Sequence, residues 1–379
     1  MIPAFSSPWL RRAGIALAAM LCAVPAFAAK MEISTVFSYA NSDPYDRANL
    51  YGFNHAPNVT LLPDGSLIAA WFSGAHEGDI HQLILQARST DGGKSWSAAT
   101  TLVDIPRKSD FDPAFIVKGK KTWMVFAAGR WNRYPWVGRR EAEKAQIGLD
   151  SYRLYVMESD DSGRTWSDSV VAVGKRGFSC KNGIVLKDGR ILLPVYDDSG
   201  GGKWATSMLR SDDDGKTWNW VGQVLAAEGK AGGEPAVVEL DNGAILTAMR
   251  SRDGHIWFAQ SQDAGDTWAA PWASEFDAAT SSQALFRTKA GQVLLVYNAC
   301  KPPERTPLAL RILDQKTMKW GEPLEIASAP APGQDVWSSQ VAYPSITELA
   351  DDTLVVVWTE ISLAPNAQSG KIMAARIKL

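Results

Sequence analysis

Acidic and imidazole side chains gather in one short segment of this chain. Residues 74–81 read Gly-Ala-His-Glu-Gly-Asp-Ile-His, and their ionisable members are His76, Glu77, Asp79 and His81. A carboxylate in such a segment can act as a general acid or base, and an imidazole can do the same or bind a metal. The spacing matches no zinc motif, so we expect no metal site and interpret His76 and His81 as loop-surface residues.

Other cofactor motifs are absent from the sequence. It contains no Gly-rich phosphate-binding loop and no Ser-His-Asp order, so we expect no nucleotide, flavin or other cofactor. Two cysteines lie beyond the N-terminal segment, Cys180 and Cys300, and their spacing matches no metal or redox motif. The sequence is compatible with either a disulfide between them or two free thiols.

A repeat shows which elements must position the ionisable residues. Four segments share the pattern Ser-x-Asp-x-Gly-x-Ser/Thr-Trp, and a degenerate fifth copy spans residues 314–320; the four begin at Ser89, Ser159, Ser211 and Ser261. Ser and Asp can bond nearby backbone N–H groups, Gly supplies the positive φ of a tight turn, and Trp can cover the hairpin. We interpret these segments as structural hairpins that carry no chemistry themselves.

A second series of turns, each leading into an apolar strand, precedes the hairpins. It has six copies, at residues 63–71, 118–127, 187–193, 241–246, 290–295 and 351–357. Each repeat predicts about four short strands, and such a unit cannot bury both of its faces alone. Six of these units arranged radially make an all-β, six-bladed β-propeller, which we predict as one domain over residues 29–379.

Two segments fall outside the six units. Residues 31–38 read as a strand without a blade of its own, and we predict that this strand completes the sixth blade and closes the ring without an exposed edge. Residues 129–152, rich in Arg and Trp, are interpreted as a long loop inserted in the second blade.

The first 28 residues read as a targeting segment. Arg11 and Arg12 precede an apolar stretch over residues 13–24, and Ala26-Phe27-Ala28 fits the small-residue cleavage rule. That stretch is shorter than the roughly 20 residues that span a bilayer. We therefore expect cleavage after Ala28, a periplasmic or secreted mature chain, and no membrane span after cleavage.

The composition bears on the partners. The chain has 39 Lys and Arg against 41 Asp and Glu, a net charge of −2, which offers no basic excess of the kind that nucleic-acid binding needs. We expect no nucleic-acid partner and a monomer.

The 16 tryptophans are far more than a core requires. Beyond those of the hairpin copies, Trp71, Trp123 and Trp358 fall in the apolar strands.

The hairpins, the strand count and the export signal together resemble the sialidase superfamily, in particular its bacterial sialidase-like branch with Asp-box (BNR) repeats. The resemblance covers essentially residues 50–379 and implies a propeller of sialidase type that hydrolyses a terminal acidic sugar. Sialidases bind the substrate carboxylate with three arginines, use a tyrosine paired with a glutamate as nucleophile, and use an aspartate as acid/base. A neutral tyrosine suits this reaction because a carboxylate nucleophile would be repelled by the carboxylate on the anomeric carbon.

Most of the residue set implied by the resemblance is present. Tyr343, in Ala-Tyr-Pro-Ser, matches the nucleophile, and Glu234, in Gly-Glu-Pro-Ala, matches its glutamate. Arg250 and Arg305 match the second and third arginines, and Glu360 matches the carboxylate that steadies the first. Because these residues stand at equivalent places in different blades, we expect them to converge at the mouth of the central channel.

The first arginine is the departure from the family pattern. The corresponding segment reads Asn-His-Ala-Pro, so His55 stands where the family has an arginine. A histidine is mostly neutral at pH 7 and cannot form a bidentate fork with a carboxylate. We expect weaker carboxylate binding or a substrate other than ordinary sialic acid, and Glu360 is free to polarise His55 instead.

The acid/base position has two candidates, and one more carboxylate stands near the expected site. Asp79 fits the family's aspartate best, and Glu77 is the alternative. Asp112, in Asp-Phe-Asp-Pro at the start of the second blade, is expected to bind sugar hydroxyls at the rim. We also expect Trp131, Trp136 and Trp337 at that rim.

Three functions remain open at this point. The first is a secreted exo-glycosidase that acts on sialic acid or a related 2-keto-3-deoxy sugar of a glycoconjugate, with retention through Tyr343. The second is a propeller lyase or glycosidase that acts on uronate-containing glycans, with His55 as acid/base. The third is a glycan-binding propeller without catalysis.

Overall fold

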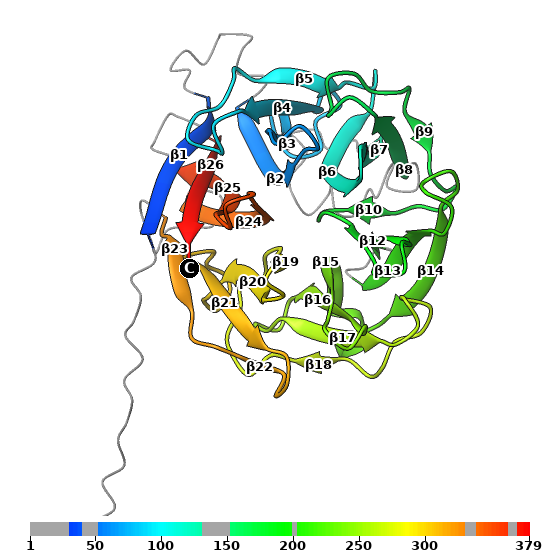
Figure 1. Cartoon of the computed structure of the whole chain (residues 1–379), viewed down its shortest axis with the longest axis vertical. Helices are drawn as coiled ribbons and strands as arrows, with labels where there is room; N and C mark the ends of the chain where they lie inside the picture. Colours follow the sequence, from blue (N-terminus) through cyan, green and yellow to red (C-terminus); the bar gives the residue numbers. More distant parts are fainter. Residues whose placement is uncertain (1–29, 40–51, 131–151, 199–202, 330–338, 363–369) are drawn as a thin grey trace, which may run out of the picture.

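The computed structural model describes residues 30–39, 52–130, 152–198, 203–329, 339–362 and 370–379. Over these residues the strands form six antiparallel sheets placed radially around one axis (Figure 1). This confirms the predicted six-bladed β-propeller. The predicted targeting segment with its cleavage after Ala28 lies outside the described residues, as do Trp131, Trp136 and Trp337.

Each blade runs outward from an innermost strand at the axis. The first two blades consist of β2 (Phe53–Leu61), β3 (Leu67–Gly74), β4 (Leu83–Ser89) and β5 (Thr100–Val103), and of β6 (Ser109–Lys118), β7 (Lys121–Gly129), β8 (Arg153–Ser159) and β9 (Val170–Val171). The third consists of β10 (Phe178–Ser179), β11 (Ile184–Val185), β12 (Ile191–Asp198), β13 (Trp204–Ser211) and β14 (Asn219–Val224).

The other three blades repeat this order. The fourth consists of β15 (Ala231–Glu239), β16 (Ile245–Ser251), β17 (Trp257–Ser261) and β18 (Trp272–Ala273), after a short 3-10 helix, η3 (Ala227–Gly229). The fifth consists of β19 (Ala284–Arg287), β20 (Val293–Asn298), β21 (Leu308–Asp314), β22 (Lys319–Trp320) and β23 (Leu324–Ala327). The sixth consists of β24 (Ser339–Glu348), β25 (Leu354–Ser362), β26 (Gly370–Lys378) and β1 (Lys30–Ser38).

The N-terminal strand closes the ring, as predicted. β1 pairs antiparallel with β26, from Lys30 opposite Lys378 to Ser38 opposite Lys371, and the two strands lie side by side in Figure 1. Val36 of β1 is buried in the same core cluster as Trp71 of blade one. β1 therefore covers the outer edge of the last blade, which would otherwise expose unpaired backbone groups.

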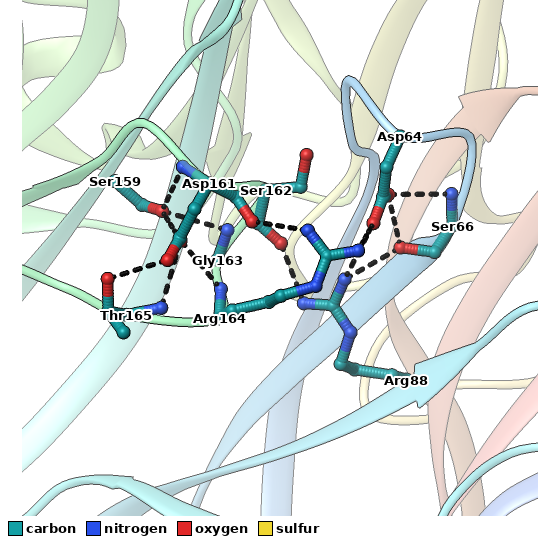
Figure 2. Close-up of polar contacts among 9 residues, drawn as sticks. All are labelled: Asp64, Ser66, Arg88, Ser159, Asp161, Ser162, Gly163, Arg164 and Thr165. Atoms are coloured by element: carbon teal, nitrogen blue, oxygen red, sulfur yellow. Dashed lines mark hydrogen bonds and ion pairs between the residues drawn. The ribbon is translucent and has the colours of Figure 1, made fainter.

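The Asp-box hairpins have the predicted geometry. In the second blade, Asp161 accepts hydrogen bonds from the side chain of Ser159 and from both N and Oγ1 of Thr165, while Gly163 has a φ of 69° (Figure 2). Trp166 at its end packs partly buried against a core cluster. The hairpins therefore act as structural turns, as their sequence indicates.

The hairpins also join neighbouring blades. Arg164 of the second hairpin donates to Asp64 in the first turn of blade one, at 2.7 Å (Figure 2). Arg88, at the end of β4, donates to the carbonyl of Ser162 and to the hydroxyl of Ser66. Because this face is occupied by structural turns, the functional residues must be sought at the opposite ends of the innermost strands.

The tryptophans assigned to the apolar strands lie in the blade cores, with Trp71 fully buried and Trp123 and Trp358 each 1% exposed. Cys180 and Cys300 are both free thiols, so no disulfide joins the blades they belong to. None of the described segments is a helix of the length and apolarity that a membrane crossing requires.

Candidate active site

Four innermost strands share a strained residue at one end. At this end each strand carries a β-bulge in which a non-glycine residue with positive φ precedes a proline; these residues are Ala56 (51°), Asp112 (53°), Glu234 (42°) and Tyr343 (60°). A left-handed backbone costs such a residue about 1–3 kcal/mol, and this kind of strain clusters at functional sites. The bulges re-aim the side chains at the axis, so the strain marks the end of the channel where chemistry is expected.

Three of the predicted residues form one hydrogen-bonded group. The hydroxyl of Tyr343 donates to Glu234 Oε1 at 2.8 Å. Arg250, from the end of β16, donates from Nη1 to the same carboxylate oxygen at 2.7 Å and to the hydroxyl of Tyr343 at 2.8 Å. Blades four and six thus bring together a phenol, a carboxylate that can take its proton, and a guanidinium that bridges them.

The ionisation of this group follows from its burial. Burial raises the pKa of Tyr343 well above its usual range, although the guanidiniums of Arg250 and Arg305 oppose the shift. Burial alone would lower the pKa of Arg250, but the carboxylate of Glu234 outweighs it and the pKa is raised. The phenol is therefore neutral and the guanidinium charged at neutral pH, so Tyr343 needs Glu234 as a base in order to act as a nucleophile.

His55 lies directly against the phenol ring. The two ring centroids are 4.1 Å apart, and His55 is 3% exposed. Its Nδ1 is buried without a hydrogen-bond partner among the described residues. Burial, reinforced by the charges of Arg305 and Arg250, lowers its pKa well below the usual value. The expected neutral imidazole is therefore in place, beside the phenol, where the family has a cation.

Two predicted residues remain: Arg305, matched to the third arginine, and Glu360, matched to the carboxylate that steadies the family's first arginine. Arg305 donates to Thr280 O (3.2 Å) and Gln340 Oε1 (3.1 Å), and its Cζ lies 5.5 Å from the centroid of the Tyr343 ring. Glu360 pairs with Lys371 across the β25–β26 ladder at 3.6 Å. Within the described residues no hydrogen bond joins Glu360 to His55.

The carboxylates of the segment at residues 74–81 separate into two roles. Asp79 accepts hydrogen bonds from the backbone N–H groups of Ala75 (3.3 Å) and His81 (2.9 Å), so its carboxylate shapes the loop. Glu77 lines the cavity beside Tyr343, whereas Asp79 does not. The structure thus places the alternative candidate, rather than the preferred one, where a substrate would bind, because the loop backbone occupies Asp79. Of the two histidines in this segment, His76 is half-buried and His81 is exposed.

Asp112 of the second blade faces the same cavity from its bulge and is 6% exposed. Burial, with the nearby carboxylates of Glu234 and Glu77, raises its pKa well above the usual range. A buried carboxyl group that keeps its proton can donate a hydrogen bond to a sugar hydroxyl or a proton to a leaving group.

The cavity itself has a volume of about 180 Å³ and opens among blades one to four and six. Its polar lining residues are His55, Glu77, Asp112, Glu234 and Arg250, and its aromatic ones are Phe72, Phe111, Phe178, Tyr196, Trp204 and Tyr343. The other aromatic rings were not foreseen from the sequence, where they read as strand or loop residues. Trp204 is the clearest omission: Arg250 and Arg252 approach its ring to 5.1 and 4.1 Å.

Lys181 is the other omission. It belongs to blade three, between β10 and β11, and is 3% exposed, with its Nζ 5.8 Å from the centroid of the Tyr343 ring. In the sequence Ser-Cys-Lys-Asn-Gly it looks like an ordinary loop lysine, since only the closed ring brings blade three to blade six.

Sequence and structure comparisons agree on the family. The BNR repeat-like domain family matches residues 65–356. The sialidase of Paraclostridium sordellii is 28% identical over 237 residues, covering 56% of this chain and 56% of that protein. The sialidase of Micromonospora viridifaciens is 26% identical over 334 residues, covering 78% of this chain and 48% of that protein. The chain thus spans about half the length of these curated relatives.

Solved structures share the fold at low identity. A protein of unknown function from Dyadobacter fermentans superposes with a TM-score of 0.70 at 18% identity, covering 92% of this chain and 99% of that one. The Trypanosoma rangeli sialidase in complex with sialic acid gives 0.68 at 17% identity, covering 91% and 58%. With the family match extending over most of the chain, this six-bladed propeller belongs to the BNR-repeat branch of the sialidase superfamily.

Proposed function

We propose that this protein is a sialidase-like exo-glycosidase, which hydrolyses a terminal sialic acid or related 2-keto-3-deoxy sugar from a glycoconjugate with retention of configuration. The observation that carries the proposal is the contact of Tyr343 with both Glu234 and Arg250, at 2.8 Å each. The curated relatives named sialidases support the reaction class. A buried tyrosine with its own base suits a substrate whose anomeric carbon carries a negative charge.

The proposed reaction has two steps. Oη of Tyr343 attacks the anomeric carbon while its proton passes to Glu234, and the glycosidic bond breaks as an acid protonates the leaving oxygen. Water then attacks the anomeric carbon and gives a proton to the conjugate base of that acid, the bond to Oη breaks, and the phenolate regains the proton from Glu234. Each step inverts the anomeric centre, so the product retains the configuration of the substrate.

Glu77 is our candidate for the acid that protonates the leaving oxygen, with Asp112 as the second. Both face the cavity, whereas the carboxylate of Asp79 is committed to backbone N–H groups. Arg250 and Arg305 flank Tyr343 and supply the positive charge for the substrate carboxylate. His55 adds an uncharged donor or acceptor instead of a third cation, so we expect weaker carboxylate binding than a three-arginine clamp gives.

The nucleophile is tested with an aryl ketoside of sialic acid. Tyr343→Phe should lower turnover by about 10³-fold or more, because the phenyl ring cannot form the covalent intermediate. Tyr297→Phe is the matched control: its hydroxyl accepts a hydrogen bond from Arg311 in the core of blade five, away from the cavity. Turnover by the Tyr343→Phe protein near the wild-type rate would refute the assignment.

The acid is identified by comparing leaving groups. Glu77→Gln should lower turnover strongly for a sugar leaving group and little for an activated phenol, which leaves without a proton. Asp79→Asn should affect both substrates alike through the loop, and Asp112→Asn shows whether the second carboxyl group shares the role. Equal losses for Glu77→Gln with both leaving groups would exclude Glu77 as the acid.

One observation favours a second function, elimination from a uronate-containing glycan. A neutral, buried His55 whose Nδ1 lacks a partner can serve as a base at neutral pH, next to a phenol that can serve as an acid. A lyase of this kind would release a product with a C=C bond conjugated to the carboxylate. The ultraviolet absorbance of that product during incubation with uronate polysaccharides separates the two functions, and glycan binding without any product would indicate a non-catalytic propeller.

We also propose that the mature enzyme is exported after removal of residues 1–28. N-terminal sequencing of the protein recovered from the periplasm or the medium tests this, and a chain that still begins at Met1 there would contradict it.

A further inference from the structure

Lys181 is a buried cation that the residue set of the site does not include. It is 3% exposed and lines the central channel, a cavity of about 420 Å³ bordered by the innermost strands. Its Nζ donates to the carbonyl of Pro344 at 2.6 Å, and no carboxylate of the described residues lies within ion-pair distance of it. Lysine is almost never fully buried unless it is paired, so its position calls for a function.

The hydrogen bond holds the backbone of the nucleophile. The bulge in β24 takes Tyr343 and Pro344 out of the strand ladder, which pairs Ala342 and Ser345 with β25 but skips the two residues between them. The carbonyl of Pro344 lies in this bulge and accepts its hydrogen bond from Lys181 of blade three, on the far side of the channel.

The other bulges show that this contact does not require a charge. The carbonyl of Pro113, at the bulge in β6, accepts a hydrogen bond from the amide of Asn58 at 2.6 Å. The carbonyl of Glu234, at the bulge in β15, accepts one from the amide of Gln283 at 3.0 Å. Among the bulges of the described strands, the one that carries the phenol is held by an ammonium group, which brings a positive charge to the phenol.

The placement of the charge fits this purpose. Lys181 lines the channel below the Tyr343 ring, whereas Glu234 and Arg250 meet its hydroxyl in the cavity above. Burial lowers the pKa of Lys181, while the negative charge of Glu234 counters the shift. A cation 5.8 Å from the centroid of the ring, in a site shielded from water, stabilises the phenolate relative to the phenol.

We propose that Lys181 is a positioning residue that holds the Tyr343 bulge and stabilises the phenolate. The inference rests on the proposed function, in which Tyr343 Oη attacks the anomeric carbon and later leaves it as a phenolate that takes its proton back from Glu234. A poorer phenolate is a poorer leaving group, so loss of the charge should slow the second step most, and the glycosyl-enzyme should accumulate.

Two substitutions separate the charge from the hydrogen bond. Lys181→Gln keeps an amide donor for Pro344, as Gln283 does for Glu234, and removes only the charge, whereas Lys181→Met removes both. Lys187→Gln is the matched control, a lysine at the exposed end of the same channel. With an aryl ketoside, Lys181→Gln should lower kcat about tenfold or more with KM reduced or unchanged, and intact-mass spectrometry of quenched reactions should detect the protein plus one sugar residue.

A readout without substrate keeps the test independent of the proposed function. The nine tyrosines are labelled with 3-fluorotyrosine, and the ¹⁹F signal of Tyr343 is assigned by its loss in Tyr343→Phe. Titration should give a higher phenol pKa in Lys181→Gln than in the wild type and no change in Lys187→Gln. If no ketoside is hydrolysed but the phenol pKa is higher in Lys181→Gln, the proposed substrate is wrong and the electrostatic role stands. An unchanged phenol pKa, or a wild-type kcat in Lys181→Gln, would overturn the role.

Discussion

Asp110 should make the stability of this propeller fall as the pH rises. Its side chain is fully buried; Oδ2 accepts a hydrogen bond from Ile105 N at 2.9 Å, and Oδ1 has no partner among the described residues. Burial raises its pKa to about 8, from the usual 3.8 of an aspartate. The folded protein thus keeps a proton on Asp110 that the unfolded chain releases above about pH 4, and ionisation in the fold opposes folding.

The size of the effect follows from linkage. Each pH unit between the unfolded and folded pKa values removes about 1.4 kcal/mol of stability, so at pH 7 the carboxyl group costs about 4 kcal/mol relative to a neutral group of the same shape. This contribution is absent below about pH 4 and complete once the pH exceeds the folded pKa. Asp110→Asn should therefore stabilise the protein at pH 7, and its advantage at pH 5 should be about 3 kcal/mol smaller.

The assay is guanidinium unfolding followed by tryptophan fluorescence at pH 5, 6 and 7. Asp104→Asn, at an exposed carboxylate of the adjoining segment, controls for the removal of one negative charge. A difference between Asp110→Asn and wild type that stays constant from pH 5 to pH 7 would refute the reasoning, because a buried proton is what makes it vary. The backbone of Asp110 also supports the segment that carries Glu77. Its carbonyl accepts a hydrogen bond from Gln82 Nε2, and Gln82 Oε1 accepts one from the backbone N–H of Gly78, next to Glu77.

Two further predictions concern the closing strand and the missing arginine. Val36→Ala in β1 should lower the free energy of unfolding by about 1.5 kcal/mol, because Val36 is buried against blade one, whereas Ile33→Ala at an exposed position should change it by less than about 0.5; equal effects in urea unfolding would argue against closure by β1. His55→Arg should lower KM for an acidic ketoside about tenfold by adding a charged donor near Arg250 and Arg305, and a KM that stays unchanged or rises would show that the substrate carboxylate binds elsewhere.

The fold could be predicted because its signals are local. Each Asp box encodes its own turn, and the contacts of Asp161 stay within residues 159–165, so sequence spacing alone reveals them. Closure by β1 followed from counting, since five hairpin copies left one blade without a fourth strand. No comparable local signal exists for the other residues around Tyr343.

The site could be predicted only in part, because its contacts join different blades. Glu234, Arg250 and Tyr343 came from the family resemblance, and the ring brings them into hydrogen-bond contact. Lys181 and Trp204 have no motif of their own, since their roles depend on which side chains the ring places opposite them. The choice between Asp79 and Glu77 depends on backbone N–H directions in the loop, which the order of residue types does not encode.

The four strained bulges indicate a site that exists before substrate binds. Each left-handed residue before a proline costs about 1–3 kcal/mol, and the fold retains four of them at the same end of the channel. Three carry a functional group, on Asp112, Glu234 and Tyr343, while blade one has Ala56 in this place. There the backbone N–H of Ala56 is bound by Thr359 Oγ1 of blade six at 3.1 Å, which fixes His55, one residue earlier, beside the phenol. Blade one thus keeps the strained turn, while the side chain next to it, His55, is uncharged. The departure from the sialidase pattern therefore concerns the charge offered to the substrate, and the backbone that presents this charge is preserved.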